Sequence, residues 1–154
     1  MRTRAKFFAA VSGMAAAGAL LIGAPTAASA SSDPGACAPN GRTVYKDGDN
    51  RPEIQCTLTR GNVPVRAHGT NGAQIVGYLT YGGRANWFLW QCHGDENYIG
   101  SYFNNVWAYT EADNGTWGYV PETYFAGGAN NQASSVLPWK IGVNDQPPYQ
   151  FNCG

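Results

Sequence analysis

The sequence contains few charged residues and few histidines, and its apolar residues are not spaced as in a helix. Asp, Glu, Lys and Arg make up only 13% of the 154 residues, and the two histidines are His68 and His93. Beyond residue 30 no stretch repeats apolar residues every 3.6 positions, which argues against a helical fold. Between Gly77 and Phe125 the one basic residue is Arg84. A groove for single-stranded nucleic acid needs far more positive charge, so nucleic acid is not expected as a partner.

Residues that would carry catalysis are also scarce. A nucleophilic cysteine or serine needs a neighbouring base. Cys92 and His93 are adjacent, so on a strand their side chains point to opposite faces. Neither Gly-x-Ser-x-Gly nor His-Glu-x-x-His occurs, the patterns of a nucleophile elbow and a catalytic zinc site. We therefore expect no enzymatic activity. Two acidic pairs leave a minor hydrolase as an alternative: Glu111 with Asp113, and Asp95 with Glu96.

Patterns of metal ligands are incomplete. Residues 47–50 resemble the start of a calcium loop. However, Pro52 stands in the sixth position, where that loop needs glycine, and Leu58 in the twelfth, where it needs glutamate. Residues 93–96 (His-Gly-Asp-Glu) place possible ligands in one loop, without a further partner in the pattern. We expect solvated turns at both places, with no metal and no cofactor.

Residues 1–30 have the features of a secretory signal peptide. Three basic residues precede an apolar run over residues 7–24, and Ala28-Ser29-Ala30 forms a small-x-small cleavage pattern. The first cysteine lies seven residues beyond Ala30, so no lipid anchor is expected. Removing residues 1–30 leaves seven basic and ten acidic residues, a net charge of −3. We expect a released protein, extracellular or associated with the cell wall, with no membrane segment after cleavage.

All four cysteines follow residue 30 and would reach a compartment where disulfides persist: Cys37, Cys56, Cys92 and Cys153. We expect two bridges, for which three pairings are possible. We favour Cys37 with Cys153, which would tie the two tails together, and Cys56 with Cys92, which would pin the first strand to an inserted loop.

Short apolar alternations separated by Gly and Asn turns predict an all-β domain. Strands are expected at residues 54–60, 63–66, 75–81, 85–91, 98–103, 106–110 and 116–120. Asn104-Asn105 is expected to form the two-residue turn of a hairpin. Residues 31–43 are rich in Ser, Asp, Pro, Gly and Ala and are expected to be mobile apart from Cys37. The predicted organisation is a signal peptide (1–30), an N-terminal extension (31–53), a β-barrel (54–125), and a linker with a docked tail (126–154).

The order of four short motifs resembles the bacterial SH3 family. That family has a Val-Arg strand entry, then a Val-Gly-x-Leu strand, a Trp-containing strand and a closing Gly-Trp-Val-x-x-x-Tyr-Leu. The matching residues here are Val65-Arg66, residues 76–79, Trp107, and residues 118–120 with 124–125. Two features depart from the pattern: Tyr119 replaces the closing Trp, and the turn after the first motif reads Ala-His-Gly-Thr where the family has Ser-Gly-Pro-Ser. Residues 92–106 look like an insertion. The resemblance implies a small SH3-like β-barrel that binds without catalysis, similar to the modules that target peptidoglycan hydrolases to peptide stems or cross-bridges.

Aromatic residues are more frequent than the core of a small β-domain needs. From Gly77 to Phe125, 14 of 49 residues are Phe, Trp or Tyr, and six are charged. Tyr and Trp join a large apolar face to a polar group, which suits stacking on sugars or holding an extended peptide. The candidate ligand contacts lie off the expected core face, on the insertion or beside a turn: Tyr78, Trp90, Tyr102, Tyr109 and Trp117.

The sequence therefore predicts a secreted, monomeric, disulfide-stabilised binding module for cell-wall peptidoglycan or an extracellular peptide. The alternative is a secreted inhibitor or toxin-like effector of another protein, which would act through a rigid exposed loop at residues 93–97.

Overall fold

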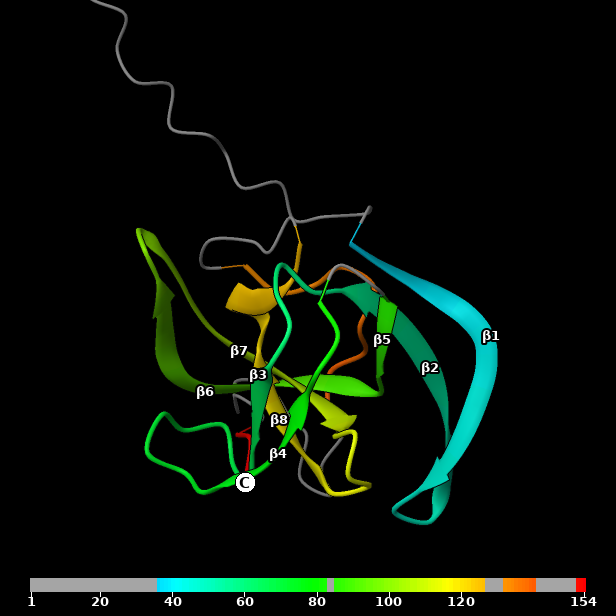
Figure 1. The fold of residues 1–154 in the computed structure, drawn as a ribbon. Coiled ribbons are helices and arrows are strands. Elements are labelled where there is room, and N and C mark those ends of the chain that lie inside the picture. The colour runs from blue at the N-terminus through cyan, green and yellow to red at the C-terminus, as the bar shows by residue number, and fades with distance from the viewer. Residues whose placement is uncertain (1–35, 83–84, 127–131, 141–151) are drawn as a thin grey trace, which may run out of the picture.

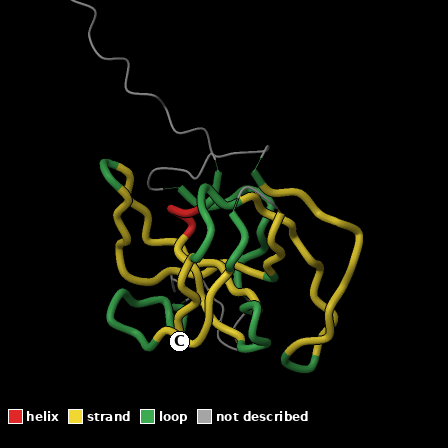
Figure 2. The backbone as a smooth tube through the Cα atoms, viewed as in Figure 1, coloured by secondary structure: helices red, strands yellow, loops and turns green. Residues whose placement is uncertain are grey.

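A computed structural model describes residues 36–82, 85–126, 132–140 and 152–154, which fold into two antiparallel sheets (Figure 1). The three-stranded sheet has the order β1 (Cys37–Lys46), β2 (Asp49–Thr57), β5 (Ala85–Phe88). The five-stranded sheet has the order β4 (Ile75–Leu79), β3 (Val63–Arg66), β8 (Trp117–Pro121), β7 (Tyr102–Glu111), β6 (Trp90–Ile99). A 3-10 helix, η1 (Glu122–Tyr124), follows β8. The all-β prediction is confirmed, but the described strands do not close into the single barrel that we expected (Figure 2).

One hydrophobic cluster joins the two sheets, and strand alternation decides which residues enter it. Val63 and Val65 of β3 are fully buried, whereas the residues that alternate with them are partly exposed. Ile54 of β2 belongs to the same cluster. Phe88 of β5 packs on Phe125, with ring centroids 4.9 Å apart. Burial of these apolar side chains is the main force that holds the sheets together.

The two disulfides differ from the pairing that we favoured. Cys37 bonds to Cys56, and Cys92 bonds to Cys153. Cys37 and Cys56 lie directly opposite each other on β1 and β2, with Cα atoms 4.1 Å apart, so each is the nearest partner for the other. The favoured pairing was wrong because it placed Cys37 in a tail that flanks the barrel, whereas Cys37 begins β1, which pairs with β2.

The N-terminal part of the mature chain is built into the fold as a hairpin. β1 and β2 are joined by Asp47 and Gly48, which have φ angles of 54° and 87°. Positive φ angles at both central residues of the turn match the right-handed twist of the strands. At Gly48 the missing Cβ makes this conformation accessible. β2 then pairs with β5, so residues 37–53 form part of the smaller sheet.

The segment that resembled an insertion belongs to the hairpin of β6 and β7, and its turn is not where we expected it. β6 and β7 pair from Trp90 opposite Tyr109 to Ile99 opposite Tyr102. The turn therefore lies at residues 100–101, where Gly100 has a φ of 60°. Asn104 lies inside β7, fully buried, and its side-chain amide donates to the carbonyl of Gln132 at 2.7 Å. An asparagine pair tolerates a turn, but here the side chain of Asn104 anchors the tail.

The described parts of the C-terminal tail line one edge of β6. Trp139 forms a parallel bridge with Gln91, and Asn152 forms another with His93. The amide N–H of Cys153 donates to the carbonyl of His93 at 2.9 Å. The predicted docking of the tail thus holds for these parts, whereas residues 141–151 lie outside the described chain. Covering a strand edge removes a template for unwanted pairing with other chains.

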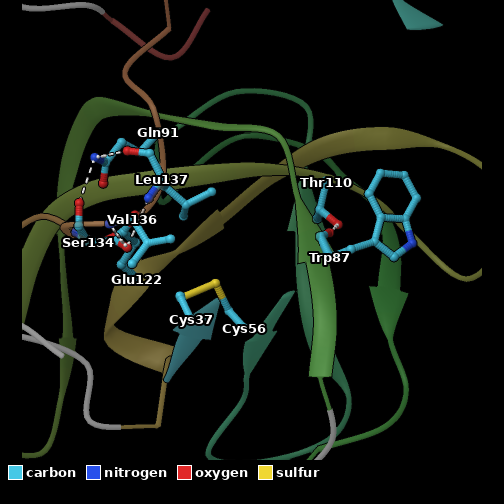
Figure 3. Close-up of a disulfide and its surroundings, with 9 residues drawn as sticks. All are labelled: Cys37, Cys56, Trp87, Gln91, Thr110, Glu122, Ser134, Val136 and Leu137. Carbon is cyan, nitrogen blue, oxygen red and sulfur yellow. Dashed lines mark hydrogen bonds between the residues drawn. A yellow bond between two sulfur atoms is a disulfide. The ribbon is translucent and has the colours of Figure 1, made fainter. Parts of the chain in front are cut away.

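Two buried polar side chains hold residues 132–140 in place (Figure 3). The amide of Gln91 donates to the carbonyl oxygens of Ser134 and Leu137 at 3.0 and 2.7 Å. The carboxyl of Glu122, 2% exposed, accepts the N–H of Ser134 at 2.9 Å. Burial raises the pKa of Glu122 to about 8, against a smaller lowering from that hydrogen bond. Residues 132–140 are therefore attached to β6 and η1 through specific hydrogen bonds.

Candidate functional site

One row of residues crosses the five-stranded sheet on the face opposite the main core. Strand register places Arg66 of β3 opposite Tyr119 of β8, Tyr119 opposite Tyr109 of β7, and Tyr109 opposite Trp90 of β6. Trp117 lies two residues before Tyr119 on the same strand, so it shares this face. The alternation that directs valines of β3 into the core therefore directs aromatic rings of β6, β7 and β8 to the other side.

Five rings make up what we call the aromatic ladder: Trp87, Trp90, Tyr109, Trp117 and Tyr119. Tyr109 is at its centre. Its ring is stacked on Trp90 at 4.3 Å between centroids and on Trp117 at 5.3 Å, and it contacts Tyr119 at 4.9 Å. Trp87 of β5 meets Trp117 edge-on at 5.4 Å. Such pairs contribute roughly 0.5–1.5 kcal/mol each beyond area burial.

The backbone holds β5 against β7 where the ladder passes between them. The hydroxyl of Thr110 donates to the carbonyl of Trp87 at 2.6 Å, as Figure 3 shows. The N–H of Leu89 donates to the carbonyl of Tyr109 at 2.9 Å. Trp87 is thereby brought from the smaller sheet to the edge of the ladder.

Two cations from the β1–β2 hairpin lie over the rings. The ammonium nitrogen of Lys46 is 4.8 Å from the ring centroid of Trp117 and 5.8 Å from that of Tyr109. The guanidinium carbon of Arg51 is 5.6 Å from the ring of Trp90. The face of an aromatic ring is electron-rich and attracts cations. The ladder is thus in contact with two of the chain's own cations.

The ladder is partly covered, and its tyrosines are neutral. Trp90 and Tyr119 are only 5% and 6% exposed, whereas Trp87, Tyr109 and Trp117 are half-buried. Burial, with a smaller contribution from the charge of Asp47, raises the pKa of Tyr109 to about 12. Burial likewise raises the pKa of Tyr119 to about 12, with a smaller contribution from Tyr109. Both hydroxyls therefore remain uncharged across the physiological range.

The structure brings together three of the five predicted contacts and separates the other two. Trp90, Tyr109 and Trp117 belong to the ladder. Tyr78 is 48% exposed on β4, and Tyr102 is 49% exposed at the start of β7, next to the hairpin turn. Tyr78 and Tyr102 are therefore isolated surface rings.

Sequence reasoning missed four residues of the site. The rings of Trp87 and Tyr119 were left out, as were the cations Lys46 and Arg51. Alternation with Trp117 would have placed Tyr119 on the ladder face. Nothing in the sequence shows that Lys46 and Arg51 reach the rings, because the contact depends on how the two sheets pack.

Residues 93–97 form an irregular part of β6 that hydrogen bonds hold rigid. The register of β6 against β7 shifts between His93 and Asn97. The indole N–H of Trp107 donates to the carbonyl of Asp95 at 2.8 Å. Asn71 donates from its backbone to the carboxylate of Asp95 at 3.1 Å and from its amide to the carbonyl of Glu96 at 2.6 Å. Asp95 and Glu96 are nevertheless exposed. The segment is a bulge.

The acidic pairs have structural partners. Asp113 accepts the N–H of Thr80 at 2.8 Å, and Glu96 accepts the hydroxyl of Tyr98 at 2.6 Å. That hydrogen bond raises the pKa of Tyr98. Within the described ranges, no three His, Cys, Asp or Glu side chains gather as a metal site. The same ranges contain no helix long and apolar enough to cross a membrane.

A scan of the chain against protein-family models finds no match, and searches of curated proteins and of solved structures find none either.

Proposed function

We propose that the mature protein is a secreted, non-enzymatic binding domain that recognises cell-wall peptidoglycan or another extracellular peptide through the aromatic ladder. The observation that carries this proposal is the ladder itself. Five rings form one connected array: four lie on the face of the five-stranded sheet away from the main core, and Trp87 joins them from β5 of the smaller sheet. Stacked Trp and Tyr rings with neutral hydroxyl groups offer both apolar area and hydrogen bonding to a sugar or a peptide.

The resemblance to the bacterial SH3 family supports the same proposal. Val65-Arg66 and residues 118–120, which carry the first and last motifs, lie on neighbouring strands with Arg66 opposite Tyr119. We propose an SH3-like origin for this part of the larger sheet. The ladder passes through these motif strands, so the binding surface would lie on the part of the chain that resembles a wall-binding module.

Secretion is supported by the two disulfides, which indicate an oxidising, extracellular type of environment. We propose that residues 1–30 are removed during export. N-terminal sequencing of the protein from the culture medium is expected to begin at Ser31, and an intact Met1 would contradict this.

Co-sedimentation with purified peptidoglycan tests the binding function. The probe is the oxidised mature protein, residues 31–154, across a salt series. We expect pelleting that resists salt, because apolar stacking is not screened by ions. Trp117→Leu keeps apolar volume but removes the ring, and it should abolish pelleting. Tyr102→Leu removes a ring outside the ladder and should leave pelleting intact. Equal pelleting by all three proteins, or none by the wild type, would contradict the proposal.

The rigid bulge favours inhibition of another protein as a second candidate function. Hydrogen bonds to Asn71 and Trp107 hold residues 93–97 in one conformation while leaving Asp95 and Glu96 exposed. A rigid, exposed segment binds with little ordering cost. Purified extracellular peptidases and glycosidases would be assayed with the wild type and with Glu96→Ala. Inhibition lost in Glu96→Ala but kept in Trp117→Leu would favour this function over wall binding.

A further inference from the structure

Lys46 occupies the ladder in an unusual way for the tip of a hairpin. Its neighbours at residues 47–50 are all exposed, yet its own side chain is only 23% exposed. The nearby carboxylate of Asp47 lies 3.4 Å from the ammonium nitrogen. The rings of Tyr109 and Trp117, nearly parallel at 24°, both lie beneath the ammonium nitrogen. The pair of rings therefore forms a binding position for an ammonium group, which we call a seat, and the side chain of Lys46 occupies it.

Arg51 fills a second seat from the same face of the same hairpin. Lys46 is opposite Asp49, and Arg51 is opposite Val44, two positions further from the turn. Residues two apart on a strand share a face, so Lys46, Val44 and Arg51 all point toward the ladder. The guanidinium of Arg51 lies over Trp90, at the other end of the stack from Trp117. Two cations thus cover three stacked rings.

The outer half of this hairpin has few other contacts to lose. In residues 41–50 only Val44 and Lys46 are partly buried. The pairing of β1 with β2 shifts register between Pro39 and Thr43, and Gly41 there has a φ of 78° with open space around it. Beyond this bulge, β1 and β2 remain bonded to each other down to the Asp47-Gly48 turn. The bulge therefore separates the outer half, which has its own backbone pairing, from the inner half of the hairpin.

We propose that the aromatic ladder is a receptor for the ammonium side chains of a peptide, and that the β1–β2 hairpin is its lid, with Lys46 and Arg51 filling the seats until the ligand's cation replaces them. The inference rests on the proposed function, since it names the ligand class of the same surface. A cationic ligand fits because its charge would replace the cation–π contacts that the rings lose when the hairpin moves away. The net charge of −3 of the mature chain also favours a positively charged partner.

The test compares two peptide probes and two lid variants. The probes are blocked Gly-Lys-Gly and blocked Gly-norleucine-Gly, which differ in the ammonium group. Lys46→Gln vacates one seat. Arg42→Gln removes the same charge from the same hairpin, at a side chain that is 78% exposed and pairs with Glu53 instead of a ring. Binding is measured by NMR on the oxidised protein, residues 31–154, from the shifts of the tryptophan indole N–H signals.

We expect Lys46→Gln to bind the lysine probe about 3- to 30-fold more tightly than wild type, the range set by one cation–π contact. Arg42→Gln should match the wild type, and the norleucine probe should bind neither variant measurably. Equal binding of the two probes, or equal affinities in Lys46→Gln and wild type, would overturn the inference. If the inference were overturned but pelleting with peptidoglycan still depended on Trp117, the proposed function would be retained without the inference. If pelleting did not depend on Trp117, the proposed function itself would fail.

Discussion

The carboxyl group of Glu122 is buried behind residues 132–140, where it has one hydrogen bond. Its Oε2 atom accepts the N–H of Ser134, and its Oε1 atom has no hydrogen-bond partner among the described residues. Burial of this kind penalises the charged form, which is why the pKa rises from its ordinary 4.5 to about 8. The substitution Glu122→Gln keeps the shape and the acceptor while removing the charge.

The pH dependence follows from the two protonation states. Well below pH 4.5 the carboxyl is protonated in both the folded and the unfolded chain, so Glu122 does not lower the free energy of unfolding there. As the pH rises from 4.5 to about 8, the unfolded chain loses the proton while the folded protein keeps it, so the free energy of unfolding falls. Above about 8 the folded protein ionises too, and the loss levels off. At about 1.4 kcal/mol per pH unit, the total loss is on the order of 5 kcal/mol.

Urea denaturation of wild type and Glu122→Gln at about pH 5 and about pH 8.5 measures this effect. The variant introduces a buried side-chain amide N–H, so it carries a constant offset at every pH. The free-energy difference between variant and wild type should shift by about 4 kcal/mol in favour of the variant across this range. Effects of other acidic groups far from the site cancel in the difference. A difference that does not change with pH would refute the account of Glu122.

Two further predictions concern the disulfides and a close backbone contact. Cys92 and Cys153 are separated by 61 positions and Cys37 and Cys56 by 19, so replacing the first pair by Ser should cost about 4 kcal/mol and the second about 3 in the chain-entropy model. Urea denaturation measures both, and a larger cost for the shorter loop would contradict the model. Gly94→Ala should destabilise by about 1–3 kcal/mol, because the added Cβ would meet the backbone of Gly69 and the ring of Trp107. Gly72→Ala has open space and serves as the control, so equal melting temperatures for the two variants would contradict the packing account.

Local patterns predicted the strands in which apolar residues alternate. β3, β4 and β8 lie within two residues of the expected ranges. β1 was not predicted, because the Pro-Asn-Gly run near its start consists of turn formers with weak strand propensity. Pairing with β2 and the Cys37–Cys56 disulfide place this segment in the sheet. Context of this kind lies outside any local window.

The site was predictable only as a set of residue types. Trp90, Tyr109 and Trp117 stood out because aromatic side chains exceeded what the core needs. Their arrangement in one row depends on the register between β6, β7 and β8, which the sequence does not display. The position of Lys46 over Trp117 depends further on how the smaller sheet packs against the larger one. Residue chemistry was therefore readable, whereas the geometry that joins the residues was not.

The indole N–H signals of the five tryptophans test the central claim, that the aromatic ladder is the binding surface. The measurement is an NMR titration of the oxidised mature protein with soluble fragments of enzymatically digested peptidoglycan. Trp87, Trp90 and Trp117 belong to the ladder. Trp107 is fully buried in a cluster with the Cys92–Cys153 disulfide and Tyr119, but its indole N–H donates to the carbonyl of Asp95, outside the ladder. Trp139 stacks on His93. We predict shifts of the Trp87, Trp90 and Trp117 signals that saturate, with the other two signals unmoved. Shifts confined to Trp107 and Trp139, or no shift at all, would contradict the claim.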